Sequence, residues 1–135
     1  MIIYYIHKIN QPIQILNSYE EVKRNYLYGN LENIKGIENE KEIKENCEIY
    51  LNNKRIDFCY EYKFEKEDKN EIKIISKTPL NNTNFIFSGC SSLTSLNLSN
   101  FNTNNVTNMW NMFFGINKKS CNLICNDKKI IKEFS

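Results

Sequence analysis

A charge-free tract, residues 81–117, most constrains what this chain can fold into. It contains no Asp, Glu, Lys, Arg or His, whereas the residues before it are rich in Lys and Glu. Apolar residues recur within it at regular intervals: Leu93, Leu96, Leu98, Phe101, Val106, Met109, Met112 and Phe113. A flexible polar linker is the alternative reading, but a linker has no interior to fill. We therefore expect the tract to fold, with these side chains in one interior.

The spacing of the apolar residues predicts two kinds of local structure. Leu93-x-x-Leu96-x-Leu98 matches the strand part of a leucine-rich repeat, in which Leu96 and Leu98 point inward. The next apolar residues follow at helical spacing, at Met109, Met112 and Phe113. We expect one short strand and then one short helix, joined by a chain reversal.

Two similar segments within the tract indicate a repeat. Phe87-Ser88-Gly89 and Phe113-Phe114-Gly115 are 26 residues apart, within the ~20–29 residues of a leucine-rich repeat. Stacked repeats bring equivalent positions to ~4.8 Å, where like charges repel and Ser, Thr and Asn can hydrogen-bond. This spacing gives a physical reason for the absence of charge.

Residues 83–115, with the stretch CSSLTSLNLSNFNTNNVTNMWNMFFG, resemble the BspA-like leucine-rich repeat family in its mycoplasma-type version. The resemblance implies a parallel-sheet solenoid used in adhesion or protein–protein contact, often on cell surfaces, and it implies no catalytic residues. The chain departs from the pattern at Phe101, where Asn or Cys is expected, and at Trp110, where a small polar residue is expected. About three repeats are normally needed for stability, so the flanking regions must cap the stack, or the chain is a fragment or a decayed member.

The first eighty residues read as strands around one helix. Ser18 and Glu21 fit a capping box that begins a helix over 19–28. Expected strands cover residues 2–9 and 13–16, which form a hairpin, residues 47–51 and 55–64, which form a second hairpin, and residues 71–76. This order is compatible with a β-grasp-like layer, although many α+β layouts share it.

The expected fold class is therefore α+β, with a small strand-rich N-terminal domain followed by a minimal leucine-rich repeat solenoid. Residues 1–80 would form the N-terminal α+β capping domain. Residues 81–135 would form the short repeat stack and its C-terminal cap. A chain of 135 residues with 41% hydrophobic residues is long enough to bury such a core.

Composition argues against several classes of function. The net charge is +2, and the only basic excess is a tail, residues 118–135, with five Lys against Asp127 and Glu133. This tail is too short for a nucleic-acid footprint. No run approaches the ~18 apolar residues of a membrane span, and the apolar start lacks the basic residues of a signal peptide. Ala is absent, which an AT-rich genome explains most simply, so abundant Asn is not taken as a functional sign.

Candidate chemistry is weak throughout the chain. His7 is the only histidine and is expected to be structural or superficial. The five cysteines lack CxxC spacing and are expected to be mostly buried, reduced thiols: Cys47, Cys59, Cys90, Cys121 and Cys125. Cys90, Cys121, Cys125 and His7 could supply four zinc ligands, but their spacing is poor. We expect no metal and no cofactor.

The sequence thus favours a non-enzymatic module for protein–protein interaction or adhesion. The expected partner-binding residues are Asn97, Ser99, Asn100 and Asn102, at the exposed strand edge, and Trp110, on the expected outer helix. Packing is the alternative role for Trp110. The alternative is a truncated structural member that has no ligand and associates with itself. The compartment stays unknown, and the family resemblance suggests a cell surface if the chain is a fragment.

Overall fold

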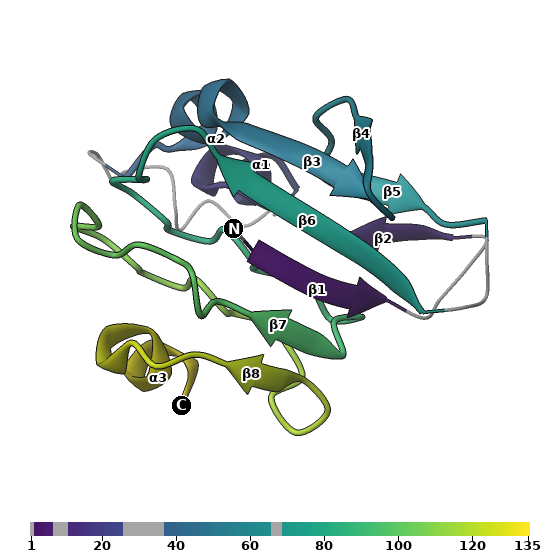
Figure 1. The fold of residues 1–135 in the computed structure, drawn as a ribbon. Coiled ribbons are helices and arrows are strands. Elements are labelled where there is room, and N and C mark those ends of the chain that lie inside the picture. Colours follow the sequence, from purple (N-terminus) through teal and green to yellow (C-terminus); the bar gives the residue numbers. More distant parts are fainter. Residues whose placement is uncertain (1, 7–10, 26–36, 66–68) are drawn as a thin grey trace.

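A computed structural model describes residues 2–6, 11–25, 37–65 and 69–135. These residues form three short helices and eight strands (Figure 1). The helices are α1 (Tyr19–Asn25), α2 (Glu40–Asn46) and α3 (Lys128–Phe134). The strands are β1 (Ile2–Ile6), β2 (Pro12–Gln14), β3 (Cys47–Leu51), β4 (Lys54–Ile56), β5 (Glu61–Lys63), β6 (Asn70–Ser76), β7 (Ser95–Asn97) and β8 (Asn122–Ile124).

Six of the strands form one sheet in the order β4-β3-β6-β1-β7-β8. Strand β1 lies in the middle and pairs antiparallel with β6 on one side and with β7 on the other. The last pair, β7 and β8, is parallel, with Leu96 beside Leu123. Strands β2 and β5 form a separate antiparallel pair. Figure 1 shows β8 as the outermost strand on the side away from β3 and β4.

The expected fold class, a β-grasp-like α+β domain followed by a leucine-rich repeat solenoid, is wrong. Among the described residues the structure has three short helices and mostly antiparallel sheets, without a solenoid. Strand β7 is bonded antiparallel to β1, whereas a solenoid strand would have parallel neighbours on both sides. The physical reason is that so short a tract cannot bury its own faces, so its one strand extends the N-terminal sheet.

The expected helix over Met109, Met112 and Phe113 is also wrong. The Met112 N–H donates to the Met109 carbonyl at 3.1 Å, and the Phe114 N–H donates to Asn111 at 3.2 Å. These are four-residue turns closed by bonds between residues three apart, and Asn111 between them has a φ of 51°, which interrupts a right-handed helix. The expectation that the apolar residues share one interior is confirmed for seven of the eight. Five of them are buried in the main core, Leu93, Leu96, Leu98, Met112 and Phe113, and Phe101 and Met109 pack against it. Val106 is half-buried but lies outside that core.

The strand predictions for the first eighty residues were partly correct. The hairpin of β3 and β4 and the strand β6 are confirmed. The hairpin between residues 2–9 and 13–16 is wrong, because β2 pairs with β5 instead of β1. The single strand over 55–64 is also wrong, because residues 57–60 separate β4 from β5. The first error concerns pairing between distant segments, which alternation within a segment does not specify, and the second is a break within one segment.

Helix α1 begins where the capping signal places it. The Glu21 N–H donates to the Ser18 hydroxyl at 3.1 Å, which is one bond of a capping box. The other bond would run from the Ser18 N–H to the Glu21 side chain, but this N–H donates to the Asn17 side-chain oxygen at 3.0 Å instead. The expected end at residue 28 lies outside the described residues. None of the three helices found in the described ranges is long and apolar enough to cross a membrane.

Glu40, the first residue of α2, is the centre of a network of charged and polar side chains. Arg24 of α1 donates to both of its carboxylate oxygens, Tyr60 donates at 2.7 Å, and Lys44 lies at 3.5 Å. The Arg24 hydrogen bonds lower the pKa of Glu40 to about 2. Helices α1 and α2 are thereby joined to the segment between β4 and β5.

This network predicts a pH dependence of stability below the ordinary range of a glutamate. Because the folded-state pKa of Glu40 is lowered, its contribution is complete above the unfolded value of about 4.5 and is lost as the pH falls toward about 2. Half of the Arg24 side chain is exposed, so solvent screening limits the contribution to about 1 kcal/mol. In urea titrations at pH 6, Glu40→Gln should be less stable by that amount, and the difference should vanish near pH 2. A constant difference at all pH values would contradict the assignment.

Candidate functional site

The charge-free tract contains two segments, residues 81–89 and 107–115, that lie against each other in parallel. Backbone N–H groups of the first segment donate to carbonyls of the second in four bonds of 2.7 to 3.1 Å: Thr83 to Asn108, Phe85 to Trp110, Phe87 to Met112 and Gly89 to Phe114. The Thr107 N–H donates back to the Asn81 carbonyl at 2.8 Å. The two segments therefore form one rigid base for the side chains that project from them.

Close backbone contact at the end of this stack depends on two glycines. Gly89 and Gly115 both have a positive φ, of 75° and 87°, which residues with a side chain adopt only with strain. A Cβ atom added to Gly115 would lie 3.1 Å from the Gly89 nitrogen. Phe87 and Phe113, two residues before each glycine, stack their rings at 6.0 Å. The similar triplets seen in the sequence are thus paired in space.

Trp110 projects from the second segment and is supported from beneath. Its ring meets the Phe85 ring edge-on at 5.4 Å, and Phe85 in turn lies 6.1 Å from Tyr19. The backbone N–H of Trp110 donates to the side-chain oxygens of Asn84, at 2.8 Å, and Asn108, at 3.0 Å. Trp110 nevertheless remains 40% exposed, so a large ring in a fixed position faces solvent.

Phe85 itself has an unusual backbone conformation. Its φ is 61°, which is rare for a bulky residue and costs of the order of 1 kcal/mol. The conformation is held by the Phe85 N–H bond to the Trp110 carbonyl and by the rings of Tyr19 and Trp110 on either side. Strain of this kind persists where the surroundings impose it, and here it places Phe85 beneath Trp110.

The turn after β7 carries the polar residues that the sequence singled out. Asn97 ends the strand, and its side-chain oxygen accepts bonds from the Ser99 N–H at 3.0 Å and the Ser99 hydroxyl at 2.6 Å. Leu96 and Leu98 are buried on either side of Asn97. Ser99, Asn100 and Asn102 are exposed. This arrangement is typical of an Asx turn, which orients the polar side chains outward.

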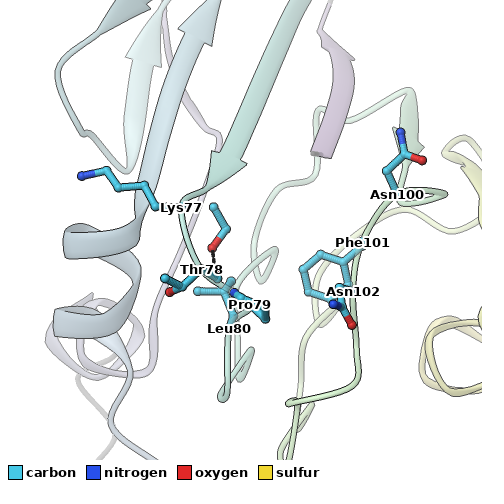
Figure 2. Close-up of a pocket in the computed structure, with 8 residues that line it drawn as sticks. Lys77, Thr78, Pro79, Leu80, Asn100, Phe101 and Asn102 are labelled. Atoms are coloured by element: carbon cyan, nitrogen blue, oxygen red, sulfur yellow. Dashed lines mark hydrogen bonds between the residues drawn. The ribbon is translucent and has the colours of Figure 1, made fainter.

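A hollow of about 140 Å³ lies between this turn and the segment after β6. Figure 2 shows the Phe101 ring facing Pro79 and Leu80 across it, with Asn102 beside the ring. One wall is fixed to α2, because the Thr78 hydroxyl donates to the Asn46 side chain at 3.0 Å. Ligand sites for small molecules measure roughly 300–1,000 Å³. The hollow therefore has room for one side chain of a partner but not for a typical cofactor.

The structure places the expected partner-binding residues in two groups. The first group follows β7: Asn97 and Ser99 are hydrogen-bonded to each other, and Asn100 and Asn102 line the hollow. Trp110 belongs to the second group, with Phe85 against its ring. Phe114 of the same segment is 58% exposed and lines a separate hollow with Lys118 and Glu133. The wall of the hollow after β6 was missed by sequence reasoning. The Thr78-Pro79 pair, which breaks the strand pattern, is the signal that marks a turn there.

Buried thiols account for most of the cysteines. All five are free, and Cys47, Cys90 and Cys121 are buried, as expected. Burial raises the pKa of each of these thiols, to about 12 for Cys47. A thiol needs a lowered pKa to act as a nucleophile at neutral pH. At neutral pH these three cysteines are therefore almost entirely in the thiol form.

In the described part of the chain, no three His, Cys, Asp or Glu side chains come together as metal ligands. His7 lies outside the described residues, as do two of the three acids of the loop at 65–68. Comparison with known proteins found no matching family model, no matching curated protein and no matching solved structure.

The contact between the two glycines predicts unequal effects of the same substitution. Gly89→Ala should cost about 1 kcal/mol of unfolding free energy, because its backbone is strained but a Cβ there has room, with the nearest atom at 3.8 Å. Gly115→Ala should cost at least about 1 kcal/mol more, because its Cβ would also press on the Gly89 backbone. Urea unfolding monitored by circular dichroism measures both. Equal losses would show that the two segments do not meet as described.

Proposed function

We propose that this chain is a non-enzymatic module for protein–protein interaction, with the uncharged surface around Trp110 as its main contact. The observation that carries the proposal is a large aromatic ring that is exposed on one side and packed edge-on against the buried Phe85 ring on the other. Trp is strongly enriched among the few residues that dominate binding energy at protein interfaces. An immobile ring also loses little conformational entropy when a partner covers it.

The surroundings of Trp110 support the same function. Phe114 adds a second exposed aromatic side chain from the same segment. The tract carries no charge, so a partner could cover it without removing water from an ionised group, which is the most costly step of burial. Aromatic residues with few charges are the typical composition of an interface core.

The turn after β7 supplies polar contacts and a place for a partner side chain. Asn100 and Asn102 can each donate and accept hydrogen bonds, and they stand beside the hollow that Phe101 lines. The resemblance of residues 83–115 to BspA-like proteins, in which such segments serve adhesion and protein contact, agrees with this use. We include the BspA-like relationship in the proposal as a relationship of sequence, without a solenoid.

The proposal predicts that Trp110→Ala weakens partner binding strongly and stability little. A partner would be isolated by affinity capture from cells that produce the protein, purified, and titrated by biolayer interferometry. Loss of a central Trp should raise Kd at least about tenfold. Ile131→Ala is the matched control, because Ile131 of α3 is equally exposed, at 42%, but lies outside the tract. It should change Kd less than about twofold.

A second reading comes from fluorescence, because Trp110 is the only tryptophan. Its emission should shift to shorter wavelength when the partner covers the ring. Trp110→Phe preserves a ring against Phe85 and guards against a loss of binding caused by misfolding. If folded Trp110→Ala binds as tightly as the unchanged chain and the emission stays constant, the surface is not the contact and the proposal is wrong.

A further inference from the structure

The outer edge of β8 is open for backbone pairing. Strand β8 is the last in the six-stranded sheet, and in the described ranges no strand pairs with its far side. The Asn122 N–H donates to the Thr94 carbonyl at 3.0 Å, and the Leu98 N–H donates to the Ile124 carbonyl at 2.8 Å, both toward β7. Successive residues of a strand direct these groups to opposite sides. The N–H and C=O of Leu123 therefore face away from the sheet.

The side chains of β8 leave this edge accessible. Leu123 is half-buried against the core, whereas Asn122 and Ile124 are exposed, Ile124 by 43%. Ile124 lies directly beside Asn97 of β7 in the strand register. An added strand would extend this face and could place one apolar side chain against Ile124.

Lysines flank β8 in the sequence, both before and after the strand. Exposed lysines precede β8 at positions 118 and 119 and follow it in α3 at positions 128, 129 and 132. Asp127 offsets part of this charge, because its carboxylate accepts bonds from the Lys129 and Ile130 N–H groups and from the Thr103 hydroxyl, and these bonds lower its pKa and keep it ionised. Glu133 is the one other acid of this region. Residues 118–135 thus keep a net charge of +3 around β8 in the sequence, although the Lys118 ammonium also donates to the Ser135 carbonyl at 3.3 Å.

We propose that the β8 edge binds an extended acidic segment of a partner protein, which adds a strand beside Leu123 and places carboxylates against the flanking lysines. Strand addition supplies affinity through the backbone, and side chains supply selectivity. The segment that fits has Asp or Glu at both ends and alternating apolar residues between them. This site is separate from the Trp110 surface and does not depend on the function proposed for that surface.

Charge also argues against a second copy of this chain at the same edge. Pairing of β8 with β8 would bring the lysines of both copies together. The opposite edge of the sheet, β4, exposes Lys54 and Arg55, so pairing of β8 with β4 of another copy would also oppose like charges. Like charges across an interface discriminate against that pairing. An acidic partner relieves the repulsion that a second copy would increase.

A synthetic peptide tests the proposal on the full chain. The probe is acetyl-Asp-Glu-Val-Thr-Ile-Thr-Val-Glu-Asp-amide with a fluorophore, titrated by fluorescence anisotropy at low salt. A version with Lys in place of every acid should bind at least about tenfold more weakly, because it would face the five lysines. A version N-methylated at the central Ile and at the next Thr loses one backbone donor from each edge, and it should also bind at least about tenfold more weakly.

Protein variants locate the site. Lys128→Glu with Lys129→Glu should weaken binding of the acidic peptide roughly fivefold or more, from two surface pairs and the added repulsion. Lys23→Glu with Lys41→Glu is the matched control, because it makes the same change of charge on α1 and α2, at the other side of the sheet (Figure 1). It should leave binding within about twofold, and so should Trp110→Ala, which separates this site from the Trp110 surface.

Three results would overturn the proposal. The first is no binding of the acidic peptide up to millimolar concentration. The second is equal binding of the acidic, basic and N-methylated peptides, which would indicate adhesion without strand pairing. The third is a dimer in sedimentation velocity that the acidic peptide dissociates, which would assign the edge to a second copy. Selective binding that the lysine substitutions weaken would support it.

Discussion

The arrangement of the charge-free tract depends on two buried asparagines outside it, Asn17 and Asn39. The side-chain amide of Asn17 donates to the Ser88 carbonyl at 2.9 Å, and that of Asn39 donates to the Asn84 carbonyl at 2.7 Å. The backbone of Asn17 adds a bond to the Ile86 carbonyl. Buried carbonyls without a partner would each cost about 1–3 kcal/mol. The two asparagines therefore supply hydrogen-bond donors to the carbonyls on this side of residues 81–89, as a neighbouring strand would in a sheet.

Because Asn17 and Asn39 bond to the carbonyls on one side of the first segment, residues 81–89, the N–H groups on its other side can bond to the second segment. The carbonyls of residues 84, 86 and 88 point toward the N-terminal part of the chain, while the N–H groups of residues 83, 85, 87 and 89 bond to the segment at 107–115. Beyond that segment lies α3, whose Phe134 ring packs edge-on against the Phe113 ring with the centroids 5.2 Å apart. One core cluster accordingly contains Ile72 and Ile74 of β6 together with Leu96, Met112 and Ile130. Trp110 lies on the second of the paired segments, and its ring packs edge-on against Phe85, which belongs to a smaller cluster with Tyr19, Val22 and Ile37.

Local features of the sequence predicted local structure well. Alternation marked β3, β4 and β6, Ser18 marked the start of α1, and the regular apolar spacing marked an interior. The pairing of β7 with β1 could not be read from the sequence, because any exposed strand edge would satisfy the same pattern. The apolar spacing at 109–114 suggested a helix because turns with bonds between residues three apart, like helices, bring side chains three positions apart to one face. Abundant Asn, attributed to coding bias, includes residues whose amides hold the fold, and only the long-range partners of Asn17 and Asn39 reveal that role.

The two proposed surfaces differ in the physical force that would govern their binding. The surface around Trp110 belongs to a tract without charge, so its contacts would come from apolar burial and hydrogen bonds, which salt at physiological strength hardly weakens. The β8 edge combines a backbone donor and acceptor with exposed lysines, and the attraction of such charges falls as the Debye length shortens from about 30 Å at 0.01 M to about 8 Å at 0.15 M. A partner that used both would therefore approach through the lysines and be retained through the tryptophan. This division follows from the way the sequence separates charge, with a neutral tract in the middle and a basic tail after it.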